Sequence, residues 1–358
     1  MSIKIEIARG EDALTELILF HEQVYQDRDA HWPPMLPLAL PTLQGASPFS
    51  QDRRFHPLIA RQDGRIVAAL VALVDGRYNR HWHERLGHVV MFEALPGTRK
   101  ATRELMDAAC EWLASQGMEA ARVGFGMLEF PFLIDDDGSL PPSVLRHNPS
   151  YYHSLLKDAG CESEKGWVDY KIEVRPELVA RYESELEGAR RAGFEIVPLG
   201  EVAPGRRMRQ FTELWNDAFK AHWGVGPFTV EELTLLFDAF TSSGVLETSV
   251  LAYRGDEPVG VLWVVPETSA AAVVKPGRSL ADSEKLNFLG IGVHESARGR
   301  GVNLAMASYA FLELIRRGAR YLSYTLVLDD NWPSRRTAEK LGAFICANYM
   351  VYRRNFRR

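Results

Sequence analysis

The order of apolar and polar positions predicts two halves that are built from the same succession of elements. In the first half, alternating "IKIEI" predicts a strand, and Asp63-Gly64 is typical of the turn of a hairpin. The predicted strands lie at 3–7, 56–74 (the hairpin), 86–95, 119–128 and 166–174, and the predicted helices lie at 12–26, 105–113 and 149–161. A Pro-rich loop is predicted at 31–49, between the first helix and the hairpin.

The second half repeats this order from Phe194 onward, with a hairpin that turns at Gly255-Asp256. The helix predicted after residue 302 carries one apolar stripe, which is typical of a helix that faces a core. The predicted strands lie at 194–199, 249–265 (the hairpin), 286–293, 320–328 and 345–354, and the predicted helices lie at 206–223, 230–240, 303–317 and 334–343.

Repeated order without obvious sequence identity predicts the duplication of one α/β unit. We expect two tandem domains, each a central mixed β-sheet flanked by helices, at 1–174 and 194–358. Residues 175–193 are polar and predict a helical connector. Because helices separate the strands, at least one pair of strands should be parallel, with a right-handed crossover.

Composition agrees with the prediction of two domains and argues against one class of binding partner. A chain of 358 residues suggests about two domains of ~150 residues. The hydrophobic content of 46% and the charged content of 25% are those of a globular protein. A net charge of −5 argues against a nucleic-acid partner, because phosphate backbones require a basic face.

Cysteine spacing and hydropathy indicate no metal, secretion signal or membrane span. Cys110, Cys161 and Cys346 are far apart, and no Cys/His cluster has the spacing of a metal site. The N-terminal residues lack the apolar core of a signal peptide. No run approaches the roughly 18 apolar residues of a transmembrane helix. We therefore expect a cytoplasmic protein.

The segment "VHESARGRGVNLA", at 293–305, carries the clearest chemistry. It places Arg298-Gly299-Arg300-Gly301 between a predicted strand and a predicted helix. A helix N-terminus exposes unpaired N–H groups with partial positive charge, and glycines let an anion approach them. The tetrad therefore predicts a diphosphate site, although its spacing is neither a Walker loop nor Gly-x-Gly-x-x-Gly. A surface turn with two solvated arginines explains the tetrad alone equally well.

The context of this loop resembles the GNAT superfamily of acyl-coenzyme A (CoA) dependent N-acyltransferases. The shared features are a strand ending "GIGV", Arg-x-x-Gly, an amphipathic helix, a strand, Asn331 and a helix ending "AEKLGA". The family signature Gln/Arg-x-x-Gly-x-Gly/Ala is met at Arg298 and Gly301, and Asn303 departs from it.

The whole chain resembles the tandem-GNAT proteins, and within them a largely uncharacterised bacterial group. The motifs in common are Asn-Pro-x-Tyr-Tyr at 148–152 and Leu-Asp/Glu-Asp-Asn at 328–331. The corresponding turn of the first half, "FEALPGTRKAT", has Gly97 alone. We favour a degenerate, non-binding copy there over a second anion site.

The resemblance implies a site for acetyl-CoA or another acyl-CoA in the second half. The loop would hold the diphosphate, and the strand Leu289–Val293 would pair its backbone with the pantetheine arm. The implied CoA-binding residues are Ile291, Gly292, Val293, Arg298, Gly299, Arg300, Gly301, Val302, Asn303, Asn331 and Arg335. For Arg335 the alternative is a solvated helix face.

The resemblance also implies a backbone N–H at Ile291 or Val293 that polarises the thioester carbonyl. A base is expected at Glu284 or Asn287, although an ordinary loop carboxylate also explains Glu284. The tyrosine that often donates the proton falls on Ala338 here. The substitutes are Tyr324 and Tyr349, for which packing in the core is the alternative.

His222 and Trp223 lie where the family recognises its acceptor, and a helix end with a tryptophan in the core explains them equally well. The predicted function is transfer of an acyl group, most simply acetyl, to the amine of a small molecule in a ternary complex. The first half would support the acceptor pocket, and the chain would be a monomer or a homodimer. The alternatives are a CoA-binding sensor or scaffold without transfer, which Ala338 favours, and an aminoacyl-tRNA-dependent transferase, which the acidic pI disfavours.

Overall fold

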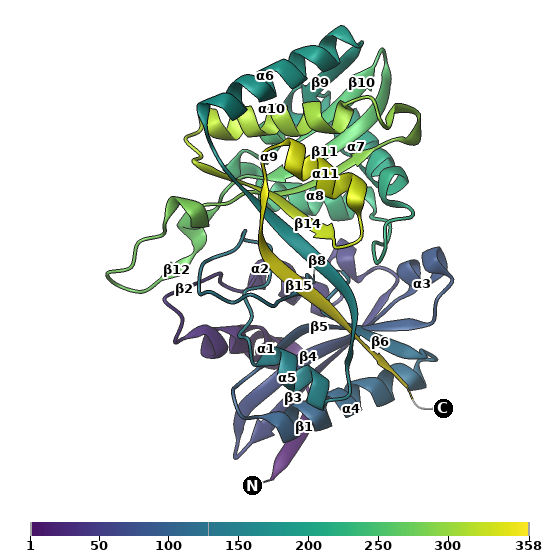
Figure 1. The fold of residues 1–358 in the computed structure, drawn as a ribbon. Coiled ribbons are helices and arrows are strands. Elements are labelled where there is room, and N and C mark those ends of the chain that lie inside the picture. Colours follow the sequence, from purple (N-terminus) through teal and green to yellow (C-terminus); the bar gives the residue numbers. More distant parts are fainter. Residues whose placement is uncertain (1, 128, 357–358) are drawn as a thin grey trace.

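A computed structural model describes residues 2–127 and 129–356 as two lobes joined by two long strands (Figure 1). Met1, Leu128, Arg357 and Arg358 lie outside this description, so the last residue of the strand predicted at 119–128 does too. The first half contains the strands β1 (Ile3–Ile7), β2 (Ala30–His31), β3 (Arg53–Gln62), β4 (Arg65–Asp75), β5 (Leu86–Ala94), β6 (Ala120–Val123), β7 (Phe132–Leu133) and β8 (Glu162–Glu173). Its helices are α1 (Gly10–Tyr25), α2 (Leu36–Leu43), α3 (Gly76–Trp82), α4 (Arg99–Ser115) and α5 (Tyr152–Asp158).

The second half begins with α6 and repeats the pattern. Its helices are α6 (Pro176–Arg191), α7 (Pro204–Phe219), α8 (Val230–Ala239), α9 (Val245–Thr248), α10 (Val302–Arg316) and α11 (Trp332–Lys340). Its strands are β9 (Phe194–Pro198), β10 (Val250–Arg254), β11 (Glu257–Val265), β12 (Val273–Val274), β13 (Phe288–Val293), β14 (Tyr321–Leu328) and β15 (Phe344–Asn355). The tandem arrangement of two mixed α/β units is therefore confirmed.

The predicted pairings within each half are confirmed as well. β3 and β4 form an antiparallel hairpin, as do β10 and β11. β5 and β6 are parallel, with α4 as the crossover between them. The helix α4 buries an apolar face that includes Leu105, Ala109 and Leu113, in agreement with the helical spacing of these residues in the sequence.

The last strand of each half completes the sheet of the other half. β15, at the end of the chain, pairs with β6 of the first half, and β8, at the end of the first half, pairs with β14 of the second. β8 and β15 also pair with each other from Phe344↔Lys171 to Arg353↔Glu162. Within the described residues, the sheet order is β1-β3-β4-β5-β6-β15-β8-β14, with β13-β11-β10-β9 as a separate sheet. The two lobes are thus interlocked by exchanged strands (Figure 1).

A segment that was predicted as a loop and a segment with no predicted element both contain helices. The Pro-rich segment 31–49 includes α2, which begins with proline in its first turn, where a missing N–H costs nothing. The polar segment after β4 includes α3, which the Asp75 carboxylate caps by accepting a hydrogen bond from the Tyr78 N–H at 2.9 Å. Trp82 of α3 donates to the Val225 carbonyl at 2.9 Å, so this helix contacts the second half.

The predicted connector is a helix, α6, that packs against the second half. Tyr182 of α6 is buried, and its hydroxyl donates to the Leu341 carbonyl at 2.6 Å. In the described part of the chain, no helix is both long enough and apolar enough to span a bilayer.

Candidate functional site

The two central strands of the second half lie side by side without a backbone ladder. β13 pairs with β11, and β14 pairs with β8. Near the start of β13, the side chain of Asn287 replaces the ladder: its amide donates to the Ser323 carbonyl at 3.0 Å and accepts from the Ser323 N–H at 2.8 Å. Asn287 is buried, so its role is to bridge the strands.

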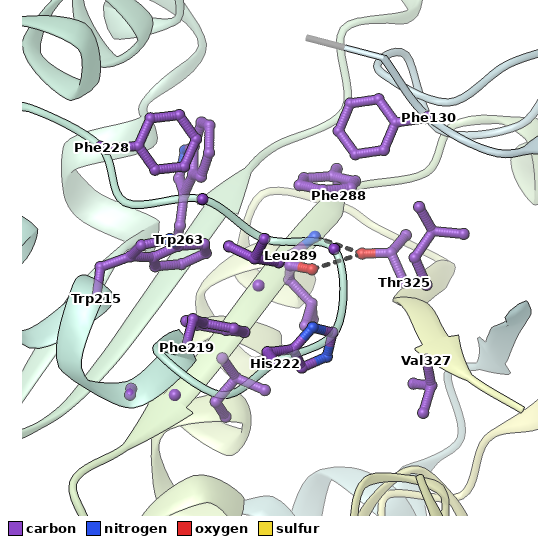
Figure 2. Close-up of a pocket in the computed structure, with 18 of the residues that line it drawn as sticks. Phe130, Trp215, Phe219, His222, Phe228, Trp263, Phe288, Leu289, Thr325 and Val327 are labelled. Atoms are coloured by element: carbon purple, nitrogen blue, oxygen red, sulfur yellow. Dashed lines mark hydrogen bonds between the residues drawn. The ribbon is translucent and has the colours of Figure 1, made fainter. Parts of the chain in front are cut away.

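Thr325 makes the next bridge and marks the point where the strands separate. Its hydroxyl accepts a hydrogen bond from the Leu289 N–H and donates to the Leu289 carbonyl, each at 2.7 Å (Figure 2). Because alternate residues of a strand direct their N–H and C=O groups to the same side, those of Ile291 face the same gap. Among the described residues the ladder does not continue there, so the edge at Ile291 is open to an extended ligand.

The loop after β13 has the geometry of an anion site. Gly299 and Gly301 have φ values of 75° and 81°, in the left-handed region that favours glycine, and α10 begins at the next residue. The Nε of Arg298 donates to the Val293 carbonyl at 3.1 Å, which fixes the loop to the end of the strand. The N-terminal N–H groups of α10 and a guanidinium therefore lie beside the open strand edge.

A cavity of about 750 Å³ joins this loop to the interior. Arg298, Gly299 and Asn303 line one end of it, Ile291 and Tyr324 line the opening between β13 and β14, and the remainder extends under α7 and α8. Aromatic side chains surround this inner part, including Trp215, Phe219, Phe228, Trp263 and Phe288 (Figure 2). A single cavity therefore contains both the anion loop and an apolar chamber.

The two glycines of "GIGV" allow α7 to cover the chamber closely. A Cβ at Gly290 would lie 2.5 Å from the Trp215 ring, and a Cβ at Gly292 would lie 2.6 Å from the Ala218 side chain. Neither distance is tolerated between atoms that do not bond, so β13 requires glycine wherever it faces α7.

The titratable side chains that line the cavity include His222 and Tyr324. Burial lowers the pKa of His222, so the imidazole is neutral at pH 7 and can accept a proton. Burial also raises the pKa of Tyr324 to about 12, and its hydroxyl lies 3.0 Å from that of Ser334. Asn331, at the same end of the cavity as Ser334, caps α11 by accepting from the Ser334 N–H at 3.3 Å.

Other residues that the sequence suggested are engaged elsewhere. Glu284 is 3% exposed and lies 2.5 Å from Arg278, and it accepts from the Leu140 N–H at 3.0 Å. This carboxylate holds a loop against the first half and does not line the cavity. Tyr349 is buried on β15, also outside the cavity lining.

Arg335 donates to the Tyr170 hydroxyl at 3.0 Å and to the Asp329 carbonyl at 2.7 Å. Trp223 stacks on Phe125 and lies 4.2 Å below the Arg122 guanidinium, so it fills the junction between the lobes. Arg335 and Trp223 therefore have structural contacts and do not line the cavity.

The remaining loop residues divide by position. Arg300 is exposed, Val302 is buried in the core, and the Asn303 amide donates to the Thr337 hydroxyl at 2.8 Å. Asn303 and Thr337 both line the cavity. Asn303, the residue that departs from the family signature, therefore links α10 to α11 through this hydrogen bond.

The corresponding strand edge of the first half, on β5, is closed by side chains. The hydroxyl of Tyr152 accepts from the Ala94 N–H at 2.9 Å, and the hydroxyl of Tyr151 donates to the Ala94 carbonyl at 2.8 Å. Arg146 donates to the Phe92 carbonyl at 2.8 Å. The tyrosines of the Asn-Pro-x-Tyr-Tyr motif thus occupy the backbone groups that a ligand would need.

Sequence reasoning missed Thr325 and most of the aromatic chamber. Thr325 is an ordinary β-branched residue in a predicted strand, and only the partner strand reveals its bridge. Trp215 and Phe219 do lie four residues apart on α7, which was a signal for one aromatic face. That signal is equally typical of a core helix.

Comparison with known proteins relates part of the second half to one family model. Residues 208–343 match the family described as the acetyltransferase (GNAT) family. The chain is 21% identical over 329 residues to a protein of Caulobacter vibrioides named bacterial ceramide synthase, and the match covers 86% of this chain and 85% of that protein. It is 22% identical over 229 residues to Protein YghO of Escherichia coli, where the match covers 63% of this chain and 58% of YghO.

Solved structures share the fold across the whole chain. A tandem GNAT protein from the clavulanic acid biosynthesis pathway has a TM-score of 0.57 at 13% identity, with 99% of this chain and 98% of that chain covered. A GCN5-related glucosamine N-acetyltransferase region of a fungal multi-domain β-N-acetylglucosaminidase has a TM-score of 0.59 at 17% identity, with coverage of 98% and 38%. These likenesses concern the fold alone.

Proposed function

We propose that this chain, of which residues 208–343 match the GNAT acetyltransferase family and which shares the fold of a tandem GNAT protein, is an acyl-CoA-dependent N-acyltransferase. The observation that carries the proposal is the open edge of β13 at Ile291, which lies between the Thr325 bridge and the Arg298–Gly301 loop. An extended amide-containing arm can pair with such an edge, and a diphosphate suits the N-terminus of the adjacent helix.

In this proposal, the diphosphate of CoA contacts the N-terminal N–H groups of α10 and the Arg298 guanidinium. The pantetheine arm lies along Ile291–Val293, between β13 and β14. The thioester then enters the cavity beside Tyr324 and Asn331, both of which line it.

The reaction proposed is direct transfer in a ternary complex. The amine attacks the thioester carbonyl while the Ile291 N–H donates to the developing oxyanion. His222, neutral because it is buried, accepts the proton that the amine loses. The C–N bond forms as the C–S bond breaks, and Tyr324, protonated at neutral pH, donates to the leaving thiolate.

The names of two similar proteins support amide formation. One is a bacterial ceramide synthase and the other a glucosamine N-acetyltransferase region. Both names denote acylation of an amine, and a ceramide is the amide of a fatty acid with a long-chain amino alcohol. We propose a small-molecule amine as the acceptor for this chain.

A CoA-binding protein without transfer activity is the second candidate, and Ala338 favours it. Ala338 stands where the family often has its proton-donating tyrosine, and it is fully buried in the core. In this alternative, acyl-CoA would bind but its acyl group would not be transferred.

The experiment that separates the two candidates combines calorimetry with a thiol-release assay. Acetyl-CoA and free CoA should each bind at one site per chain, and thiol release should accelerate with at least one amine in a panel of alkylamines, amino alcohols and amino sugars. Binding without release under any condition would favour the second candidate. No binding of either CoA would refute both.

A further inference from the structure

The cavity does not end at the reacting position but continues into the first half. Along this path the aromatic rings contact one another: Phe219 stacks on Trp215 at 4.4 Å, and Trp215 meets Trp263 edge-on at 5.9 Å between ring centroids. Phe288 of β13 then lies 5.5 Å from Phe130 of the first half. Figure 2 shows these rings around one chamber.

The far end of the cavity is built by the first half. Leu38 of α2, Tyr78 of α3 and Met127 line it. Leu38 and Met127 pack in the same apolar cluster as Trp215 and Trp263 of the second half. The apolar part of the wall is therefore continuous across the junction of the lobes.

The acidic groups at this end are already paired. Asp75 lies 2.6 Å from Arg53 and accepts from the Tyr78 N–H at 2.9 Å. Glu129 lies 2.6 Å from Arg146 and accepts from the Met91 N–H at 2.5 Å. An acceptor with several ammonium groups needs free carboxylates, and neither of these two is available to it.

These observations point to an apolar substrate, and the inference rests on the function proposed above. We propose that the cavity binds one hydrocarbon chain, with the reactive end at Ile291 and the tail directed toward Leu38 and Met127. The chain belongs either to the acyl group of the donor or to the acceptor amine. The volume of about 750 Å³, which includes the strand edge proposed for the pantetheine arm, lies in the range of ligand pockets, and an acetyl group with a short amine would leave the end at Leu38 and Met127 empty.

A binding experiment with two arms distinguishes whether the hydrocarbon chain belongs to the acyl donor or to the acceptor amine. Trp215 and Trp263 line the cavity, so intrinsic fluorescence reports occupancy. One arm compares lauroyl-CoA with acetyl-CoA, and the other compares dodecylamine with propylamine, each below the concentration at which micelles form. Burial of a methylene group gives up to about fourfold in affinity, so the twelve-carbon ligand of at least one arm should bind more than ~100-fold more tightly.

Two variants then locate the tail. Met127→Trp and Leu38→Phe both fill the end of the cavity, and each should reduce the advantage of the twelve-carbon ligand at least tenfold while the affinity for acetyl-CoA stays the same. Leu19→Trp is the control, because Leu19 is 40% exposed on α1. Thermal unfolding of all three variants identifies any that has lost its fold. If one cavity variant is unfolded, the binding result of the other cavity variant decides where the tail lies.

The outcomes separate this inference from the proposed function. Equal affinity for short and long ligands in both arms would overturn the proposal that the cavity binds a hydrocarbon chain. An advantage that survives both cavity variants would overturn its placement in the first half. Failure of free CoA to bind would refute the proposed function, and the dodecylamine arm would still report on the chain independently of CoA.

Discussion

β5 and β13 occupy equivalent places in the two halves, but one edge is closed and the other is open. On β5, Tyr151 and Tyr152 take the carbonyl and the N–H of Ala94. On β13, Thr325 bridges Leu289 and Arg298 bonds the Val293 carbonyl at the strand end, and the edge at Ile291 between them is open. The same fold therefore presents a finished sheet edge in one half and a binding edge in the other.

The comparison shows that the half without the signature differs by more than the loss of loop glycines, because side chains also occupy the backbone groups of its strand edge. Buried backbone groups without partners are costly, so a strand that no longer binds a ligand needs other partners for its N–H and C=O groups. In this chain a tyrosine pair and Arg146 supply them. The first half is thus stabilised without a ligand, and it remains free to contribute the end of the cavity.

The largest expected effect tests the two loops against each other. Arg298→Glu with Gly301→Glu should weaken the binding of acetyl-CoA more than ~100-fold, because negative charge then faces the diphosphate. The matched pair is Arg99→Glu with Gly97→Glu in the first half. Gly97 and Gly301 have φ values of 77° and 81° and open space around them, so the backbone strain is comparable.

Calorimetric titration of both pairs measures this contrast. The first-half pair should bind acetyl-CoA like the unmodified protein. Equal losses in the two pairs would show that the halves do not differ in the way their edges suggest.

The second effect concerns turnover. His222→Phe should lower kcat about 100-fold with little change in the affinity for CoA, because proton transfer by a side chain typically contributes that much or more. His56→Phe is the control, since His56 stacks on Trp112 in the first half and phenylalanine preserves the stacking.

The pH dependence of kcat/KM tests the same role of His222. Burial lowers the pKa of His222 below 6.5, and the protonated imidazole cannot accept a proton. The rate constant kcat/KM should therefore be level near pH 7 and fall only below this lowered pKa. The acid limb should disappear in His222→Phe, and a limb that persists unchanged there belongs to another group.

The third effect compares the bridges of the two edges. Thr325→Val leaves both backbone groups of Leu289 without a partner and should lower the free energy of unfolding by about 2 kcal/mol. It should also weaken the binding of CoA about tenfold, because the gap between β13 and β14 changes shape. Tyr152→Phe should cost a similar amount of stability and leave the affinity for CoA unchanged.

Urea unfolding and titration of the two variants together test this. If Tyr152→Phe weakened CoA binding as much as Thr325→Val, the closed edge would have to be part of the working site.

The smallest effect separates the two loop arginines. Arg300 is exposed and lies outside the cavity lining, so Arg300→Ala should weaken CoA binding by about threefold, as expected for a solvated charge. This loss should vanish at 1 M salt, where the Debye length is about 3 Å. A salt-independent loss would place Arg300 in direct contact with the ligand.

Much of the fold follows from periodicity, because both halves contain strongly patterned strands and amphipathic helices. The hairpin turns at Asp63-Gly64 and Gly255-Asp256 and the crossover helix α4 were all predictable in this way. The exchange of β8 and β15 was not, because alternation along a strand specifies which face is buried and not which strand lies next to it.

The candidate site was predictable to a similar degree. The loop at Arg298–Gly301 has a local chemical pattern that the sequence displays directly. Asn287 and Glu284 are typical site residues by type, but they bond to distant segments, so their engagement with Ser323 and Leu140 appears only in three dimensions. The cavity end at Leu38 and Met127 lies in a half that sequence reasoning treated as a support.

The exchanged strands also set an order of assembly during synthesis. β15 occupies residues 344–355 and is synthesised after the preceding elements of both halves, yet it pairs with β6 of the first half. Until it arrives, β6 and β8 lack their partner between them and leave backbone edges open to other chains. The first half therefore cannot complete its sheet until β15 has been synthesised, although β8, the last strand of that half, ends at Glu173 and β15 begins only at Phe344.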